Sequence, residues 1–285
     1  MKNDGISVVI STYDDPIIFL GQCLGSLLHQ EEIYEIIIVD SSKKDDIKIF
    51  CGSLKNDNIK YIYTPPKGLS DARNKGIEIS KKDIVAFTDS DCITDKDWAK
   101  NIENSFRDNV AIVGGKILPK WITNHNKILC GSTIAQGFYS LFNMGDELKE
   151  VEQVFGGNFA INKNLIKHQF LTELGRKKEN LLGGEESRLC QQVLERNLKI
   201  IYNPLAIVWH QIPKERSFRW VWRRMYYGGI NRATIGGKMT PNVVNASYNL
   251  YDILFLSLFT ISYIYGYIYG YLLWHIKRIN NINVR

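Results

Sequence analysis

Short apolar runs alternate with helix-spaced apolar stripes along residues 1–118. The apolar runs predict buried strands at residues 6–10, 35–40, 59–63, 84–91 and 110–118. The first stripe between them predicts a helix and comprises Ile17, Leu20, Leu24, Leu27 and Leu28. Strands and helices that alternate in this way form a mostly parallel sheet with helices on its faces, so we expect an α/β fold.

Two of these strands end in carboxylates. The strand at 35–40 ends in Asp40, and the run that begins at Ile84 ends in Asp89 and Asp91. In open α/β sheets, ligands bind outside the carboxyl ends of the strands. Because side chains at positions i and i+2 of an extended segment point the same way, Asp89 and Asp91 can converge on one hard cation and, through it, on a diphosphate. An Asp-x-Asp pair by itself is also typical of a helix cap or a solvated turn.

Polar residues in the second half give weaker signals. Glu185 and Glu186 follow two glycines and precede a helix, where adjacent acids usually serve as partners of the helix dipole. Two short strands, at residues 200–202 and 206–209, are expected to end at His210. A lone histidine in such a position is more often structural than functional.

The net charge of +6 is unevenly distributed along the chain. From residue 214 onward, ten Lys and Arg oppose two acids, a balance of +8 that leaves −2 for residues 1–213. The basic part predicts an anionic partner, and the apolar sequence beside it favours a membrane over nucleic acid. We therefore divide the chain into one large domain at 1–213, with halves at about 1–118 and 119–213, and a membrane-associated segment at 214–285.

Residues 216–227 are basic and amphipathic. On a helix, one arc carries Phe218, Val221, Trp222 and Met225, and the opposite side carries Arg216, Arg219, Arg223 and Arg224. Such a helix is typical of one that lies on a membrane surface. The alternative is a helix that packs on the enzyme and presents a solvated face.

Residues 253–274 carry no formal charge and are long enough to cross the core of a bilayer. Five tyrosines dilute the hydrophobicity of this segment, so a hairpin or a helix in the membrane plane is also possible. Gly266 and Gly270 have the spacing that allows close helix packing. We expect this segment to attach the chain to the cytoplasmic face of a membrane, since residues before Ile6 do not resemble a secretory signal.

Four motifs in the first half resemble the nucleotide-sugar half of a family 2 glycosyltransferase of the GT-A fold. In order they are Val8-Val-Ile-Ser-Thr-Tyr13, Ile37-Ile-Val-Asp40, Gly68-x-x-x-Ala-Arg-Asn74 and Phe87-Thr-Asp-Ser-Asp91. The four together are far more specific than the Asp-x-Asp pair alone. The resemblance extends over roughly residues 5–210 and implies a Rossmann-like GT-A sheet, followed by the C-terminal helical appendage.

The resemblance assigns the donor site by position. The donor-binding residues that it implies are Thr12, Tyr13, Asp40, Arg73 and Asp89. It further implies that Asp91 binds a divalent metal, Mg²⁺ or Mn²⁺, with Asp89 and His210 as additional ligands. The nearby Asp14 and Asp71 are equally well explained as caps.

The resemblance also implies an acceptor site and a base. Gly156, Gly157 and Asn158 match a glycine-bearing strand under the acceptor, although a plain hairpin fits these residues equally well. Glu186 matches the catalytic base; because many members of the family carry Asp there, Glu185 is the alternative. The implied reaction is an inverting, metal-dependent transfer of a hexosyl group from a nucleotide-sugar to a hydroxyl of a glycan or lipid-linked saccharide at the membrane surface.

Three rival functions differ in their chemistry. A polyprenyl-phosphate sugar synthase has an acceptor oxygen that is already anionic and needs no base, so the acidic pair favours a hydroxyl acceptor. A non-catalytic membrane-bound saccharide-binding protein would keep the fold without turnover. A sugar-nucleotide pyrophosphorylase needs a glycine-rich loop after the first strand, and Ser11-Thr-Tyr-Asp-Asp15 contains no glycine.

Overall fold

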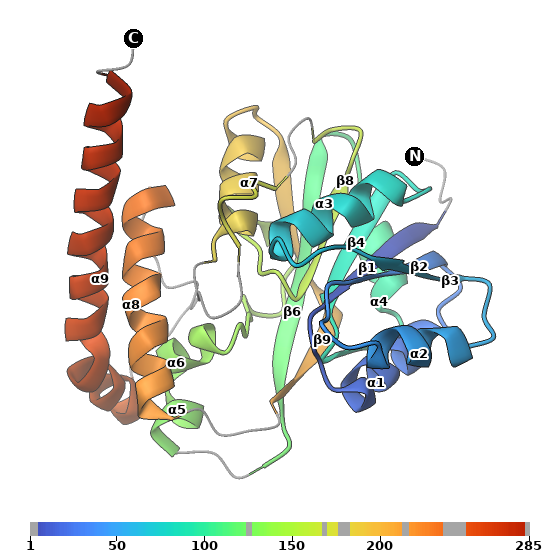
Figure 1. The fold of residues 1–285 in the computed structure, drawn as a ribbon, viewed down its shortest axis with the longest axis horizontal. Helices are drawn as coiled ribbons and strands as arrows, with labels where there is room; N and C mark the ends of the chain where they lie inside the picture. Colours follow the sequence, from blue (N-terminus) through green and yellow to red (C-terminus); the bar gives the residue numbers. More distant parts are fainter. Residues whose placement is uncertain are drawn as a thin grey trace.

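The computed structural model describes residues 5–123, 127–166, 170–175, 183–212, 217–235 and 249–282. These residues form a mixed sheet flanked by helices, with a pair of long helices standing beside it (Figure 1). The strands are β1 (Ile6–Thr12), β2 (Ile33–Asp40), β3 (Ile59–Tyr63), β4 (Ile84–Asp89), β5 (Cys92–Thr94), β6 (Val110–Trp121), β7 (Lys149–Glu150), β8 (Asn158–Asn162) and β9 (Lys199–Ile212). The expected α/β architecture is therefore confirmed.

The strands follow the order β3-β2-β1-β4-β8-β6-β9-β5, and β7 pairs with β9. β1, β2, β3 and β4 are mutually parallel. β8 runs antiparallel to both of its neighbours, β4 and β6, whereas β6 and β9 are parallel. The carboxyl ends of β1, β2 and β4 consequently lie at one edge, as in-register pairs show: Thr12 lies opposite Asp40, and Ser11 opposite Asp89.

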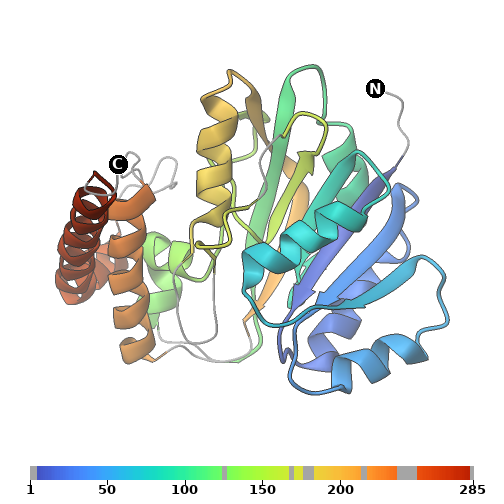
Figure 2. The same ribbon diagram turned by 45° about the horizontal axis from the view of Figure 1, so that its top comes forward.

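Helices cover both faces of the sheet (Figures 1 and 2). One face packs against α1 (Ile17–Leu27), α2 (Asp46–Ser53) and α4 (Trp98–Glu103), and the other against α3 (Leu69–Ile79) and α7 (Glu185–Leu194). Val8 and Ile10 of β1 belong to the first core, and Val9 to the second, because successive side chains of a strand point to opposite faces. Gly76 brings α3 close to β1, since a Cβ there would lie 2.4 Å from a methyl of Val9.

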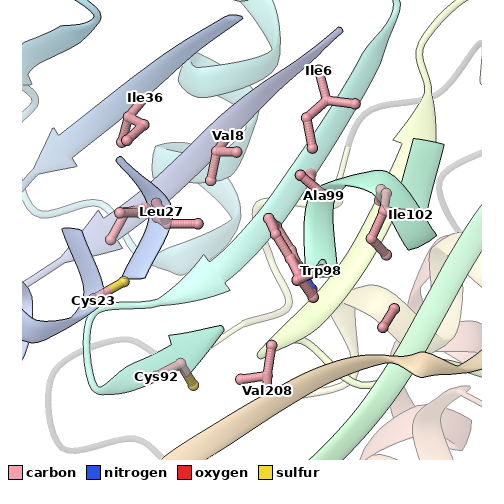
Figure 3. Close-up of a cluster of buried hydrophobic side chains, with 14 of the residues drawn as sticks. Ile6, Val8, Cys23, Leu27, Ile36, Cys92, Trp98, Ala99, Ile102 and Val208 are labelled. Atoms are coloured by element: carbon pink, nitrogen blue, oxygen red, sulfur yellow. The ribbon is translucent and has the colours of Figure 1, made fainter. Parts of the chain in front are cut away.

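The core under α4 is centred on a fully buried tryptophan (Figure 3). Trp98 packs with Ile102 of its own helix and with Val208 of β9. Its indole N–H donates to Asn158 Oδ1 over 2.8 Å, so the one polar atom of the ring is satisfied in the core. This hydrogen bond connects α4 to the start of β8, a strand near the middle of the sheet.

The C-terminal helices run side by side in the same direction. α8 spans Phe218–Ile235 and α9 spans Leu250–Ile282. Trp222 lies beside Phe259, and a Cβ on Gly266 would lie 1.9 Å from the carbonyl oxygen of Tyr226, so the backbones nearly touch. The close packing predicted from Gly266 and Gly270 is confirmed, and the partner is α8 of the same chain.

Two short helices connect this pair to the sheet. α5 (Lys127–Gly131) and α6 (Thr133–Phe138) share a buried cluster with α8 and α9. The Asp252 side chain of α9 is fully buried and accepts from Ser132 Oγ (2.8 Å) and from the backbone N–H of Ile134 (3.1 Å). The division of the chain at residue 213 stays a prediction, and these contacts show how its two parts are joined.

A sequence-based expectation about secondary structure is corrected, and one about membrane contact is narrowed. The two short strands near residue 205 form one strand, β9, so His210 lies within it rather than at its end. The apolar arc of α8 is only half available to a membrane, because Val221 and Met225 are 1% and 4% exposed inside the protein, whereas Phe218 and Trp222 are exposed; contact of α8 with a membrane surface stays a prediction. Arg216 lies outside the described residues.

Candidate active site

The acidic pair predicted at the end of β4 lies in a short turn. Asp89 is the last residue of β4, Asp91 is in the turn, and β5 begins at Cys92. β5 pairs with β9 so that Cys92 lies opposite His210. His210 Nε2 lies 3.2 Å from Asp91 Oδ2, and its Nδ1 lies 2.9 Å from the carbonyl oxygen of Tyr139. The structure therefore places His210 beside Asp91, while the possible ligand atoms that lie close together are those of Asp89, Asp91 and Cys92.

This cluster suits a hard divalent cation. Single ligand atoms of Asp89, Asp91 and Cys92 lie within 4.8 Å of one another. Burial, together with the nearby carboxylates, raises the pKa of the Cys92 thiol well above its usual value, so the sulfur stays protonated and is a poor ligand. The carboxylates of Asp89 and Asp91 are the ligand type that Mg²⁺ and Mn²⁺ prefer. Burial lowers the pKa of His210, but Asp91, Asp89 and the Tyr139 carbonyl together outweigh this effect and the net shift is upward.

The residues predicted to bind the base of the donor nucleotide lie at the ends of β1 and β2. Thr12 and Asp40 are paired in register and are 3% and 1% exposed. Asp40 accepts from the Ser42 backbone N–H and from the Tyr61 hydroxyl, each over 2.8 Å. Tyr13 is partly exposed in the loop after β1. The carboxylate of Asp40 is thus held in one orientation at the edge of the sheet.

The loop after β1 is attached to its neighbours by two other acids. Asp14 has a left-handed backbone (φ 53°), and its carboxylate accepts from the Lys43 N–H of the loop after β2. Asp15 Oδ2 accepts from Ser90 Oγ over 2.6 Å, which connects this loop to the turn that carries Asp91. Burial raises the pKa of Asp15.

Arg73 links the donor side of the site to the acid pair. Its guanidinium donates to Glu185 Oε1 over 2.7 Å and to the Gly156 carbonyl over 3.0 Å. Arg73 Nη2 also lies 3.8 Å from Asp89 Oδ1. Phe159 and Phe170 lie against the guanidinium, 5.5 and 5.7 Å from its central carbon. Because Arg73 is only 3% exposed, the structure places it beneath the site, between two sets of carboxylates.

Glu185 and Glu186 occupy the first turn of α7, after Gly184 at φ +94°. Arg73 neutralises Glu185. Glu186 Oε2 is buried and accepts no hydrogen bond from any described residue. Burial, followed by the negative charge of Glu185, raises the pKa of Glu186 to about 8, and Arg73 opposes this shift. Of these two adjacent buried acids, Glu185 pairs with Arg73, and Glu186 is the one whose raised pKa keeps it close to protonation equilibrium near neutral pH.

The predicted acceptor strand begins later than expected. Gly156 and Gly157 lie in the turn before β8, and a Cβ on each would lie 2.6 Å from Arg73 Nη2 and 3.2 Å from Asp89 Oδ2, respectively. Asn158 is fully buried, and besides its bond with Trp98 it donates to the carbonyls of Lys116 and Ala206. We correct the role of Asn158 accordingly: its side chain organises the core and does not face an acceptor.

Helix α8 reaches the site at two places that the sequence did not indicate. The ring of Trp220 lies 6.0 Å from that of Tyr139, whose carbonyl contacts His210. The Asn231 amide, oriented to satisfy both partners, donates to the Gly183 carbonyl (3.2 Å) and accepts from the Gly183 N–H (3.1 Å). Gly183 directly precedes the turn into α7, so α8 contacts both the metal side and the acid side of the site.

Comparison with known protein families identifies the class of protein to which this fold and site belong. A model of glycosyl transferase family 2 matches residues 7–168, more than half of the chain, so the chain belongs to this family. Among curated relatives, it is 25% identical over 243 residues to a glucosyl-dolichyl phosphate glucuronosyltransferase of Haloferax volcanii, covering 80% of this chain and 76% of that one. It is 24% identical over 199 residues to a pre-mycofactocin glycosyltransferase of Mycobacterium tuberculosis, covering 68% of this chain and 41% of that one.

Two solved structures share the fold. GalNAc-T7, whose crystal structure contains UDP, GalNAc and Mn²⁺, superposes with a TM-score of 0.58 at 16% identity, over 81% of this chain and 50% of that one. The mannosyltransferase PcManGT from Pyrobaculum calidifontis, in complex with GDP-Man and Mn²⁺, gives 0.58 at 17% identity, over 83% and 66%. The GT-A fold expected from the sequence is confirmed by these likenesses.

Proposed function

We propose that this glycosyltransferase transfers a hexosyl group, with inversion, from a nucleotide-sugar to a hydroxyl of a glycan or lipid-linked saccharide at the cytoplasmic face of a membrane. The observation that carries the proposal is the asymmetry of the acid pair. Glu185 Oε1 is held by Arg73, whereas no ion pair to Glu186 is found among the described residues; each of the two acids keeps one buried oxygen, Oε2, without a hydrogen-bond partner among those residues. A carboxyl group with a pKa near neutrality and a free oxygen suits a general base.

In this mechanism Glu186 accepts the proton of the acceptor hydroxyl while the hydroxyl oxygen attacks the anomeric carbon. The bond between that carbon and the diphosphate oxygen breaks, and the nucleoside diphosphate leaves with the bonding electrons. Attack from the side opposite the leaving group inverts the anomeric centre. Asp89, Asp91 and His210 would hold the divalent metal, which as a Lewis acid stabilises charge on the departing diphosphate.

The roles of the remaining residues follow from their positions. Thr12, Tyr13 and Asp40 would orient the nucleotide base at the ends of β1 and β2. Arg73 would act as a positioning residue, since it fixes Glu185 and the backbone at Gly156. Gly156 and Gly157 would allow the acceptor to approach the backbone next to Asp89.

The acceptor remains a choice between a glycan and a lipid-linked saccharide. The name of the Haloferax volcanii relative, a glucosyl-dolichyl phosphate glucuronosyltransferase, indicates a lipid-linked saccharide for that protein and supports the same class here. Helix α9 supports it too, because Leu250–Leu273 is apolar and long enough to enter a membrane. A polyprenyl-phosphate acceptor would not need Glu186 as a base.

The purified full chain in detergent provides the test. We expect one nucleotide-sugar to be hydrolysed slowly in the presence of Mg²⁺ or Mn²⁺ and transferred when a saccharide acceptor is added. NMR of the product should show the anomeric configuration inverted. Retention would overturn the mechanism, a product with a sugar-phosphate linkage would favour the polyprenyl-phosphate synthase, and binding without turnover of any donor would favour the saccharide-binding protein.

A further inference from the structure

One side of α9 is a continuous apolar surface exposed to solvent. We define the α9 outer face as the exposed large apolar residues on the side turned away from α8, namely Leu250, Ile253, Leu254, Leu258, Ile261, Ile264, Tyr265, Ile268, Tyr271 and Leu272. Ser257 lies among them, and no charged residue interrupts the segment from Ile253 to Leu273. An exposed apolar surface of this length marks an interaction site rather than ordinary scatter.

The opposite side of α9 is occupied by a basic helix. Tyr226 and Ile230 of α8 contact Gly266 and Gly270, so α8 runs alongside the middle of the apolar segment. Along this length α8 carries Arg219, Arg223, Arg224 and Arg232, the first two of them exposed. If α9 crossed a bilayer, α8 would have to enter the hydrocarbon with it, and a charged arginine near the bilayer centre is strongly unfavourable.

The first turns of α9 are equally unsuited to a crossing. Asp252 is buried against Ser132 and Ile134, and Phe255 packs near Phe138 of α6. A Cβ on Gly131 of α5 would lie 2.5 Å from the ring of Tyr251, so α5 and α9 are in close contact. These contacts attach the start of the apolar segment to α5 and α6, so the first turns of α9 are held against the protein rather than surrounded by lipid.

We propose that α9 lies in the plane of the membrane–water interface, with the α9 outer face in the acyl region and α8 on the aqueous side, its arginines among anionic headgroups. The partner is a lipid surface, and the basic C-terminal quarter supplies the charge complementarity. This inference rests on the proposed membrane attachment but not on the proposed reaction. It also places the active site next to the bilayer, because α8 contacts Tyr139 and Gly183 on the two sides of the site.

The first test is flotation of the full chain with vesicles of phosphatidylcholine, alone or mixed with phosphatidylglycerol. We expect binding that increases with the content of anionic lipid. Ile261→Glu and Ile268→Glu should each lower the affinity for vesicles by about tenfold or more, because each replaces an isoleucine that the proposal inserts into the acyl region. Ile49→Glu is the matched control, since Ile49 is 69% exposed on α2, away from α9, and should leave binding unchanged.

The second test distinguishes a helix α9 that lies in the membrane plane from one that crosses the bilayer. A fluorophore is attached to cysteine introduced in place of Ser257, Ile264 or Leu272, one per chain, and quenched by lipids that carry nitroxides at different acyl depths. These sites span about 22 Å along α9, so a crossing helix would show a steep gradient of depth, whereas a helix in the plane gives three similar, shallow depths. The unsubstituted chain measures labelling of the native cysteines.

Each outcome decides the proposal. Flotation with a depth gradient overturns the in-plane arrangement while leaving membrane attachment intact. Absence of flotation, with self-association that Ile261→Glu abolishes, assigns the α9 outer face to a second copy of the chain and overturns both. Donor hydrolysis, assayed on the same preparations in detergent, reports the reaction independently of either result.

Discussion

The two groups of carboxylates at the site differ in the source of the positive charge that balances them. The side chains of Asp89 and Asp91 are 40% and 38% exposed at the edge of the sheet. Glu185 is 4% exposed and pairs with Arg73, which is as deeply buried. The aspartates, which we call the metal edge, are therefore open to a cation from solution. The glutamates of the acid pair are balanced by a cation that belongs to the fold.

This difference suits the two groups to different proposed roles: the aspartates to binding a cation, and the acid pair to transferring a proton. The aspartates of the metal edge lie partly in contact with solvent, as the proposed metal and donor binding requires. The acid pair needs a dry environment, since burial, together with the neighbouring charge of Glu185, keeps Glu186 close to protonation equilibrium near neutral pH. Arg73 Nη2 lies 3.8 Å from Asp89, so the two groups are neighbours and their separation can be tested by substitution.

The largest expected effect separates metal binding from base catalysis. Glu186→Gln should lower kcat by about 10²–10⁴-fold, the usual contribution of a general base, while Mn²⁺ binding measured by calorimetry stays unchanged. Asp91→Asn should abolish both turnover and Mn²⁺ binding, because it removes a charged ligand from the metal edge.

Asp97→Asn is the control for charge loss near this edge. Asp97 is exposed at the start of α4 and makes no side-chain cap hydrogen bond there. It should leave both turnover and Mn²⁺ binding unchanged. Near-normal turnover of Glu186→Gln together with strong loss in Glu185→Gln would move the base to Glu185, and near-normal turnover of both would contradict the mechanism.

The next effect concerns stability and the internal cation. Arg73→Met leaves the Glu185 carboxylate buried without its partner, which typically costs about 3–5 kcal/mol. Adding Glu185→Gln removes the uncompensated charge, so the double variant should recover a large part of the loss. Thermal unfolding followed by circular dichroism measures both. If the double variant is no more stable than Arg73→Met, the ion pair is not what makes Arg73 important.

The sequence predicted the metal edge better than the acid pair because different ranges of interaction define them. Apolar alternation and strand ends are local signals, and they sufficed to place Asp40, Asp89 and Asp91 at one edge. The ion pair of Arg73 and Glu185 joins residues 112 positions apart, which no local pattern encodes. One signal was available: Arg73 lies beside Ala72 and near Gly76 on the buried side of α3, and a charge in such a stripe implies a buried partner.

Two other features escaped prediction for the same reason. The hydrogen bond from Tyr61 to Asp40 and that from Trp98 to Asn158 each depend on which elements become neighbours. The amphipathic pattern of α8 was real, but periodicity gives only the face that is buried and not what buries it. Val221 and Met225 face the protein because α5, α6 and α9 pack around them.

A smaller effect tests the contact between the glycine turn and Arg73. In Gly156→Ala the new Cβ would lie 2.6 Å from Arg73 Nη2, so the buried guanidinium must shift from its position. Overpacking of this kind typically costs about 1–3 kcal/mol. Gly25→Ala in α1 is the matched control, because nothing lies within 4 Å of its Cβ and alanine favours the helix. Unfolding midpoints of the two variants should shift in opposite directions, and equal shifts would argue against a tight fit at Gly156.

The last prediction concerns how activity and stability change gradually with pH, and it follows from the raised pKa of Glu186. As a base, Glu186 must be ionised, so kcat/KM should rise with pH and level off above about 8, with a slope near tenfold per unit below that value. For stability the sign is opposite. A carboxyl whose folded pKa exceeds its ordinary value of 4.5 binds its proton more tightly in the folded state, so the stability it provides is present at low pH and is lost as pH rises from 4.5 toward 8. Glu186→Gln removes this dependence, and the unfolding temperature of the variant minus that of the unsubstituted chain should therefore increase with pH across this window. A difference that stays constant would mean that Glu186 is already ionised at neutral pH, and that Arg73 balances both members of the acid pair.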